Sequence, residues 1–232
     1  MKLLNVGANA KTVKGDKLGE YLTGVLYLAP AKTSGYQTCP SSTEGCRASC
    51  LFTAGRGQMH SVEAARIRKT KELFEDPDVF IRDLKRDIQA LVNQAKAKGM
   101  IPCVRLNGTS DIYWPSKVPQ IFEEFSDVQF YDYTKNIKIM QKYMDGDCPD
   151  NYYLTFSRSE SNNQFYPTVL NNGYSVAMVF DNIPQVYNGF PVFVGDDTDL
   201  RFLDPPGYII GLKAKGKAKK DKTGFVIKNV VD

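Results

Sequence analysis

Short apolar segments alternate with amphipathic segments along most of this chain, and this alternation limits its fold more than any other feature. Apolar runs of strand length are separated by stretches whose apolar residues recur at helical spacing. Alternation of this kind indicates βα units around a mostly parallel sheet. The predicted strands are 25–30, 101–106, 128–134, 152–157, 174–180, 191–194 and 208–212, and the predicted helices are 61–98, 116–125, 137–143 and 163–170.

The number of units indicates the architecture. About six βα units fit a partial (β/α)6 TIM-like barrel with mostly parallel strands better than a complete barrel of eight. An open doubly wound sheet is the alternative. With 232 residues and no internal repeat or linker, the chain is expected to form a single α/β domain. Within 61–98 a second helix is expected to begin at Pro77, with Asp76 as its N-cap.

The basic character of the chain is local. Between Lys213 and Lys222 there are six lysines and one aspartate, a local charge of +5. Since the net charge is +4, the rest of the chain sums to −1. A run of lysines is usually a solvated surface, and its functional alternative is contact with the phosphates of a nucleic acid or a phosphorylated substrate. The candidate phosphate contacts are Lys213, Lys215, Lys217, Lys219 and Lys220.

Five cysteines indicate metal or redox chemistry rather than a disulfide framework. No apolar run has the length of a membrane span, and the N-terminal residues break at Gly7 before a signal-peptide region develops. We therefore expect a cytosolic protein without a membrane partner. Disulfides are rare in a reducing compartment, and an odd number of cysteines fits such a framework poorly.

Three of the cysteines form a C-x6-C-x3-C pattern directly after the first predicted strand: Cys39, Cys46 and Cys50. Cys46 and Cys50 are four apart and would share one face of a helical turn. Three soft thiolates without a neighbouring histidine suit an iron–sulfur cluster. Three ligands on a [4Fe-4S] cluster would leave one iron open to a substrate or cofactor.

Zinc is the competing metal. A structural zinc site needs four ligands, and the fourth is hard to find here. Cys103 is expected about 13 Å below the end of its strand, and Cys148 precedes a strand and belongs to the opposite edge. His60, the only histidine, is interpreted as a solvated residue at the start of a helix.

Polar residues follow the predicted strands, where ligands of α/β folds gather. Strand alternation places Cys103, Arg105 and Asn107 on one face, with Val104 and Leu106 on the other. An inward arginine needs an anion or carboxylate, and an internal ion pair with one of the aspartates is the alternative to a ligand. The candidate cavity residues are Arg105, Asn107, Ser110, Asp111, Ser157, Arg158 and Asp196. The sequence does not identify a catalytic residue among them.

Several segments together resemble the gene product 88 family, a phage-encoded group. The cysteine loop from Thr38 carries the resemblance, together with Ser110-Asp111 and the strand ends 131–135 and 157–159. The segments 195–202 and 211–218 continue it, so that it covers most of the chain from about residue 25. The resemblance implies a phage protein that acts in the host cytoplasm.

The chain is more distantly similar to radical S-adenosylmethionine (SAM) enzymes. These place a three-cysteine [4Fe-4S] cluster after the first strand of a partial (β/α)6 barrel, as the cysteine loop here is placed. They use a polar motif after the second strand to hold the methionine amino group, and 107–111 occupies that place. The spacing differs, since those enzymes have C-x3-C-x2-C. The Gly-Gly-Glu-like loop is replaced by Gly108-Thr109-Ser110-Asp111.

Three hypotheses follow. The first is a radical-SAM-like enzyme with S-adenosylmethionine as cofactor, in which Asp111, Ser157, Arg158 and Asp196 line the cavity of an unidentified small molecule. The second is a non-catalytic iron–sulfur protein for redox transfer or sensing, with a reductant as partner. The third is a zinc-stabilised nucleic-acid-binding module with the lysine segment, residues 213–222, as its contact surface.

Overall fold

The computed structural model describes residues 1–7, 10–50, 52 and 55–228. Its strands are β1 (Leu4–Val6), β2 (Tyr21–Leu26), β3 (Ile101–Arg105), β4 (Gln129–Thr134), β5 (Tyr152–Ser157), β6 (Val176–Phe180), β7 (Val186–Tyr187), β8 (Phe190–Val194), β9 (Ile209–Lys213) and β10 (Val226–Ile227). Its α-helices are α1 (Ala10–Asp16), α2 (Glu44–Ala48), α3 (His60–Glu75), α4 (Pro77–Ala97), α5 (Trp114–Lys117), α6 (Gln120–Glu124), α7 (Ile137–Met144) and α8 (Tyr166–Asn171). Its 3-10 helices are η2 (Gly55–Gln58), η3 (Asn163–Phe165), η4 (Arg201–Leu203) and η5 (Gly216–Lys220).

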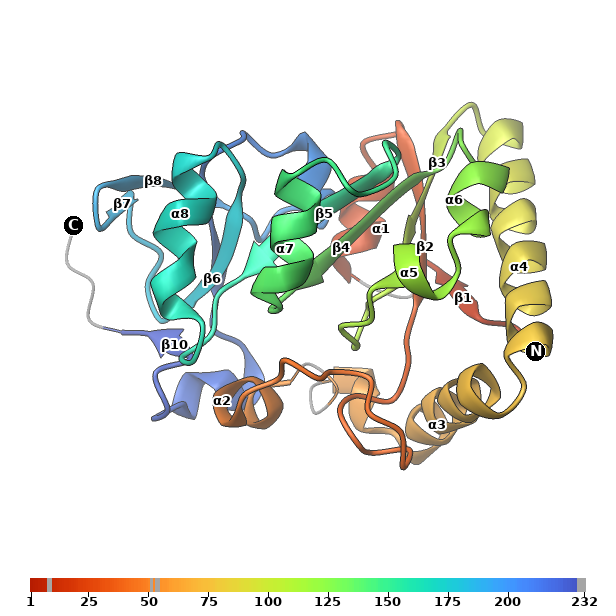
Figure 1. Cartoon of the computed structure of the whole chain (residues 1–232), viewed down its shortest axis with the longest axis horizontal. Coiled ribbons are helices and arrows are strands. Elements are labelled where there is room, and N and C mark those ends of the chain that lie inside the picture. Colours follow the sequence, from red (N-terminus) through yellow and green to blue (C-terminus); the bar gives the residue numbers. More distant parts are fainter. Residues whose placement is uncertain (8–9, 51, 53–54, 229–232) are drawn as a thin grey trace.

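The strands form one mixed sheet that is mostly parallel (Figure 1). Along the sheet the order is β1-β2-β3-β4-β5-β6-β9-β8-β7, and β10 pairs with β6. Neighbours from β2 to β8 in this order are parallel, whereas β1 and β7 pair antiparallel with β2 and β8. The predicted α/β class with mostly parallel strands is confirmed. The sheet is open, with β1 and β7 at its two edges, and does not close into a barrel.

Most predicted elements lie where expected, with shifts that have local causes. The first predicted strand, 25–30, is displaced to β2, because the backbone at Ala29 leaves the sheet. The Ala29 amide donates to Thr70 Oγ1 at 2.8 Å, and its carbonyl accepts from Thr38 Oγ1 at 2.6 Å. The predicted N-cap Asp76 is confirmed, since its carboxylate accepts from the Val79 amide.

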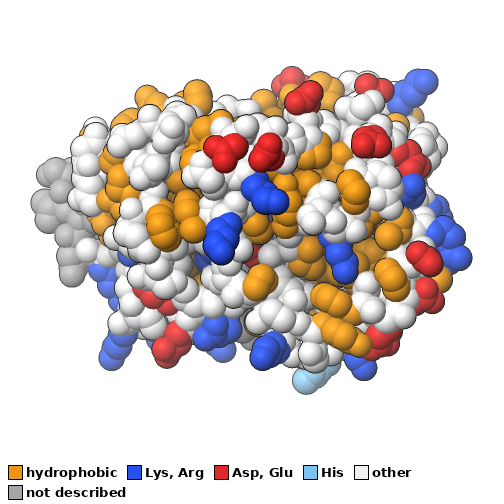
Figure 2. Space-filling view, viewed as in Figure 1, with side chains coloured by type: hydrophobic (Ala, Val, Ile, Leu, Met, Phe, Trp, Pro, Cys, Tyr) orange, Lys and Arg blue, Asp and Glu red, His pale blue; other side chains and the backbone are white. Residues whose placement is uncertain are grey.

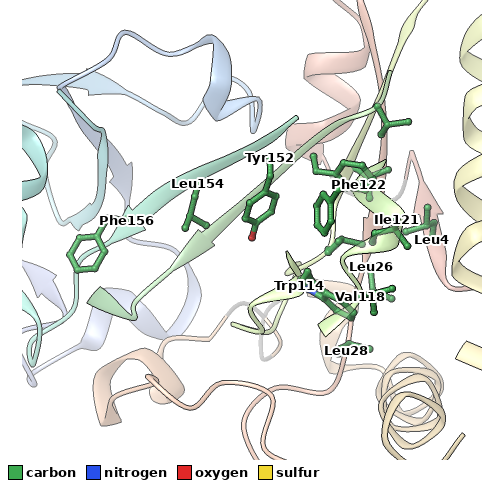
Figure 3. Close-up of a cluster of buried hydrophobic side chains, with 14 of the residues drawn as sticks. Leu4, Leu26, Leu28, Trp114, Val118, Ile121, Phe122, Tyr152, Leu154 and Phe156 are labelled. Carbon is green, nitrogen blue, oxygen red and sulfur yellow. The ribbon is translucent and has the colours of Figure 1, made fainter. Parts of the chain in front are cut away.

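The largest core lies between the sheet and the helices on one of its faces (Figure 3). It runs from β1 and β2, under α4, α5 and α6, to β5 and β6. Buried apolar area is the dominant stabilising term in such a layer. Residues labelled in Figure 3 are Leu4, Leu26, Leu28, Trp114, Val118, Ile121, Phe122, Tyr152, Leu154 and Phe156.

Among the described residues, no helix combines the length and the apolar composition of a membrane span.

The second face of the sheet is covered by the segment that follows β8. Cys103, Tyr131 and Leu200 form a buried cluster there. Arg105 pairs with Asp199 at 2.5 Å and lies over the ring of Tyr133, 4.6 Å from its centroid. The predicted alternation along β3 is confirmed for Cys103 and Arg105. The internal ion pair is the alternative that the structure supports for Arg105.

Breaking the Arg105–Asp199 pair is expected to destabilise the fold, because a buried charge without a partner is costly. We expect Asp199→Asn to lower the free energy of unfolding by about 3–5 kcal/mol, measured by urea denaturation at pH 7. The exposed Asp197→Asn serves as the matched control and should change it by about 0.5 kcal/mol or less.

A double variant, Arg105→Met with Asp199→Leu, should be more stable than Asp199→Asn, since it removes both buried charges. Equal stability of Asp199→Asn and wild-type protein would contradict the importance of this pair.

Candidate metal centre

The cysteine loop is held by backbone contacts at the carboxyl edge of the sheet. The Thr38 amide donates to the Ala31 carbonyl at 3.0 Å, and the Thr38 carbonyl accepts from the Asp111 amide at 2.8 Å. Cys39 Sγ accepts from the Ala31 amide at 3.4 Å and lies 3.6 Å from the Thr109 carbonyl oxygen. The loop after β2 and the loop after β3 therefore fix the position of Cys39 together.

Cys46 lies on α2, a single short helix that packs against the C-terminal segment (Figure 1). Thr43 caps this helix, because its hydroxyl accepts from the Cys46 amide at 3.2 Å. Cys46 packs against a small core of Ala214, Ala218, Phe225 and Val226. Residues more than 160 positions apart thus meet at one of the three cysteines.

Gly45 allows this close packing. Its amide donates to Glu160 Oε1 at 2.8 Å. A Cβ at this position would lie 2.1 Å from Thr223 Oγ1 and 2.6 Å from the Cβ of Phe225. Both distances are far below van der Waals contact, so only glycine fits without displacing α2 from the C-terminal segment.

Burial and neighbouring charges shift the pKa values of two of the thiols, Cys39 and Cys50. Burial raises the pKa of Cys39, and the nearby Asp111 and Cys50 raise it further. Burial also raises the pKa of Cys50, with Cys46 adding to the rise, whereas Arg66 and Lys135 lower it. Cys50 therefore lies within range of both other cysteines and of two cations.

The described side chains are not gathered for a single ion. Within the ranges that the structure describes, no group of three His, Cys, Asp or Glu side chains is close enough to hold one metal ion. His60, at the start of α3, is exposed. Cys103 is buried on the second face beside Thr23 Oγ1, 3.2 Å away, and Cys148 contacts the hydroxyl of Tyr113.

Asp111 contacts the cysteine loop through the Thr38 carbonyl, and Lys135 joins Asp111 to Ser157. The Lys135 amide donates to Asp111 Oδ2 at 3.0 Å, and its Nζ donates to Ser157 Oγ at 2.6 Å. Burial raises the pKa of Asp111. Lys135 was not among the residues predicted for the site. Its position directly after Thr134, at the end of β4, was the sequence signal that could have identified it.

Asn107 and Ser110 hold the loop after β3 rather than facing a cavity. Asn107 Oδ1 accepts from Ser110 Oγ at 2.8 Å, the Ile112 amide at 3.0 Å and Trp114 Nε1 at 3.0 Å. The strand ends at Arg105, so the alternation does not continue to Asn107, whose side chain contacts Trp114 in the main core.

Arg158 and Asp196 also make internal contacts. Arg158 donates to the carbonyls of Gly224 and Phe225 at 2.6 and 2.9 Å, and so supports the segment that packs on Cys46. Asp196 accepts from the Lys213 amide at 2.8 Å and pairs with Lys215 Nζ at 2.7 Å. Of the candidate residues, Asp111, Ser157 and Arg158 are thus grouped around the cysteine loop, whereas Arg105 lies on the second face.

The lysine segment is folded against the cysteine helix. Ala214 and Ala218 point into the small core with Cys46, while Lys217, Lys219 and Lys220 of η5 are exposed. Figure 2 shows Lys and Arg side chains along the lower edge of the molecule, where Figure 1 places α2 and the segment after β9. The exposed lysines therefore lie close to the candidate metal centre.

Substituting Gly45 should loosen α2. We expect Gly45→Ala to lower the free energy of unfolding by about 1–3 kcal/mol, because the added methyl group forces α2 from the C-terminal segment. Thermal and urea unfolding measure the effect. Glu44→Ala, an exposed position on the same helix, is the control. A Gly45→Ala protein as stable as Glu44→Ala would show that the close contact is not essential.

Asp132, below the loop after β3, should make stability depend on pH. Its Oδ1 accepts from the Asn107 amide at 2.6 Å and its Oδ2 from the Tyr152 hydroxyl at 3.3 Å. Burial raises its pKa from 3.8 to about 8. The native state then holds more protons than the unfolded state between these values, so the contribution is fully present below about pH 4 and is lost as the pH rises to about 8.

Urea unfolding of wild-type protein and Asp132→Asn from pH 4.5 to 8 tests this contribution. The free energy of unfolding of the wild type, relative to the variant, should fall as the pH rises. A difference that stays constant across this range would contradict a raised pKa at Asp132.

The comparisons with known proteins agree with the resemblance stated from the motifs. Neither the curated proteins nor the solved structures give a match to this sequence. The family profile described as "Gene product 88" matches residues 2–229, nearly the whole chain. This match includes the cysteine loop, the strand-end loops and the lysine segment. The chain therefore belongs to the gene product 88 family.

Proposed function

We propose that Cys39, Cys46 and Cys50 hold a [4Fe-4S] cluster with one open iron, and that the protein works as a radical-SAM-like enzyme. The observation that carries this proposal is the position of the three-cysteine loop, which is hydrogen-bonded to the loop after β3 at the carboxyl edge of a parallel sheet. This edge is where α/β proteins bind ligands.

The donor set fits such a cluster. Thiolates are the ligands of iron–sulfur clusters, and Arg66 and Lys135 favour the thiolate at Cys50. A structural zinc site needs four ligands, whereas the cysteine loop offers three thiols. Burial of Cys39 and Cys50 would shield the bound group from water.

The order of the strands supports the same proposal. From β2 to β6 the parallel strands follow one another in sequence order, and the cysteine loop comes after the first of them. A partial (β/α) barrel also has parallel strands in sequence order, and this likeness supports the proposal. A [4Fe-4S] cluster with an open iron would supply reductive chemistry to bound S-adenosylmethionine. In this proposal, Asp111, Lys135 and Ser157 would contact the ligand.

A specific observation favours a second candidate, a non-catalytic iron–sulfur protein for redox transfer or sensing. Arg105, Asn107, Arg158 and Asp196 are all engaged in internal contacts. Few of the strand-end side chains proposed for a substrate cavity therefore remain for a substrate. Such a protein would exchange electrons with a reductant and turn over no cofactor.

The lysine segment motivates a third candidate, a zinc-stabilised module that binds nucleic acid. Lys217, Lys219 and Lys220 are exposed and are available for phosphate contacts. Lys215 pairs with Asp196, which offsets its charge, whereas Lys213 donates to the neutral amide of Asn182 and keeps its charge. In each case we place the protein in the host cytoplasm of a phage infection, as the family resemblance implies.

Metal and sulfide analysis of protein purified without oxygen tests the cluster. We expect about four iron and four sulfide per chain, a broad visible absorption band and the loss of both on Cys46→Ala. Cys148→Ala is the matched control, since this partly buried thiol contacts Tyr113 rather than the loop, and it should keep its iron.

Measurements on the same preparation distinguish the three candidate functions. A change in the electron paramagnetic resonance spectrum of the reduced protein on adding S-adenosylmethionine supports the enzyme. Reversible reduction with no such change supports the redox protein. Zinc without sulfide would reject both and favour the nucleic-acid module, whose binding should then weaken steeply with salt.

A further inference from the structure

Arg66 on α3 is a partly buried cation that pairs with no carboxylate among the described residues. Its guanidinium carbon lies 5.2 Å from the ring centroid of Tyr27 and 5.4 Å from that of Phe52. Among the described residues, its buried Nε and Nη1 atoms have no hydrogen-bond acceptor. Burial lowers the pKa of Arg66, while Tyr27 and Cys50 act in the opposite direction.

Other buried arginines also have N–H groups without an acceptor, namely Arg105 at Nε and Arg201 at Nε and Nη1. Their charge is nevertheless paired, because Arg105 pairs with Asp199 and Arg201 with Asp204. Arg158 donates to two backbone carbonyls. An unmet guanidinium donor costs free energy, and a bound anion would relieve this cost. Arg66 differs from Arg105 and Arg201 in that, among the described residues, no carboxylate balances its charge. This difference indicates a bound anion.

We propose that Arg66, Tyr27 and Phe52 form a binding site for the carboxylate of a small organic molecule, with Cys50 beside it. A guanidinium matches a carboxylate with paired hydrogen bonds and stacks on aromatic rings. One guanidinium neutralises one carboxylate, whereas a phosphate dianion needs further donors. Lys135, the other cation near Cys50, is bound to Ser157.

The rings define the rest of the ligand. The ring of Tyr27 packs closely against Gly108, because a Cβ added to Gly108 would lie only 2.6 Å from the Cδ1 atom of Tyr27. Phe52 follows Cys50 by two residues, so the aromatic wall and the thiol come from one short segment. A molecule with an apolar or aromatic part next to its carboxylate fits these surroundings. The site does not depend on a bound cluster.

Alkylation of Cys50 in the metal-free, full-length chain tests the site. Iodoacetate carries a carboxylate and iodoacetamide does not, although both alkylate the thiolate. Removing Arg66 changes the thiolate fraction of Cys50 equally for both reagents. The ratio of the iodoacetate rate to the iodoacetamide rate therefore reports only the recognition of the anion. We expect this ratio to be about tenfold higher at Cys50 than at Cys148, as one charge-assisted hydrogen-bonded contact predicts.

Three variants on α3 complete the test, each first checked for a wild-type circular dichroism spectrum. Arg66→Gln should bring the ratio at Cys50 to that at Cys148, and the exposed Arg68→Gln should leave it unchanged. Arg66→Lys keeps the charge without the planar fork, so it should lose most of the preference. If Arg66→Lys kept the full preference for iodoacetate, the positive charge alone would explain the preference, and the proposed site would be overturned.

Competition in the wild-type protein does not depend on any variant folding. Acetate should protect Cys50 from iodoacetate and leave Cys148 unprotected, and inorganic phosphate at the same ionic strength should protect it less. Equal protection by phosphate would overturn the assignment to a carboxylate. A ratio at Cys50 no higher than at Cys148 would overturn the site itself, whatever metal the protein binds.

Discussion

Parallel pairing of β2 to β6 is the constraint on which the rest of the structure depends. Since parallel strands end at the same edge, the loops after β2, β3 and β4 must meet there. The contacts of Asp111 show this directly, because its amide binds the Thr38 carbonyl and its carboxylate accepts from the Lys135 amide. One residue thus connects three successive βα units and places the cysteine loop beside them.

The elements with a strong periodic or capping signal could be predicted from the sequence. Asp76-Pro77 marked the start of α4, and the alternation along β3 correctly put Cys103 and Arg105 on one face. Short elements could not be predicted, because β1, β7 and β10 have only two or three residues. The open sheet could not be distinguished from a barrel either, since closure depends on strand pairing far along the chain.

The residue types of the candidate site could be predicted from the sequence, whereas the residues that contact them could not. The Cys-rich loop is visible in the sequence, and so are polar strand ends. The partner of Arg105 is Asp199, 94 residues away, and Cys46 packs on Ala218 and Phe225. Contacts at such separation leave no local pattern. Arg66 was overlooked because a basic residue on a long charged helix gives no sign that its guanidinium is buried.

The position of each cysteine in the candidate metal centre has its own structural cause. The C-terminal segment fixes α2, the loop after β3 fixes Cys39, and Arg66 and Lys135 supply positive charge at Cys50. The central claim is that these three thiols, held by different parts of the described chain and without a fourth thiol, bind a cluster with one open iron.

Mössbauer spectroscopy of ⁵⁷Fe-reconstituted protein tests this claim most directly. The account predicts a [4Fe-4S] spectrum in which one iron site in about four changes when a small ligand is added. A spectrum with no cluster, or with four equivalent irons that no ligand perturbs, would contradict it.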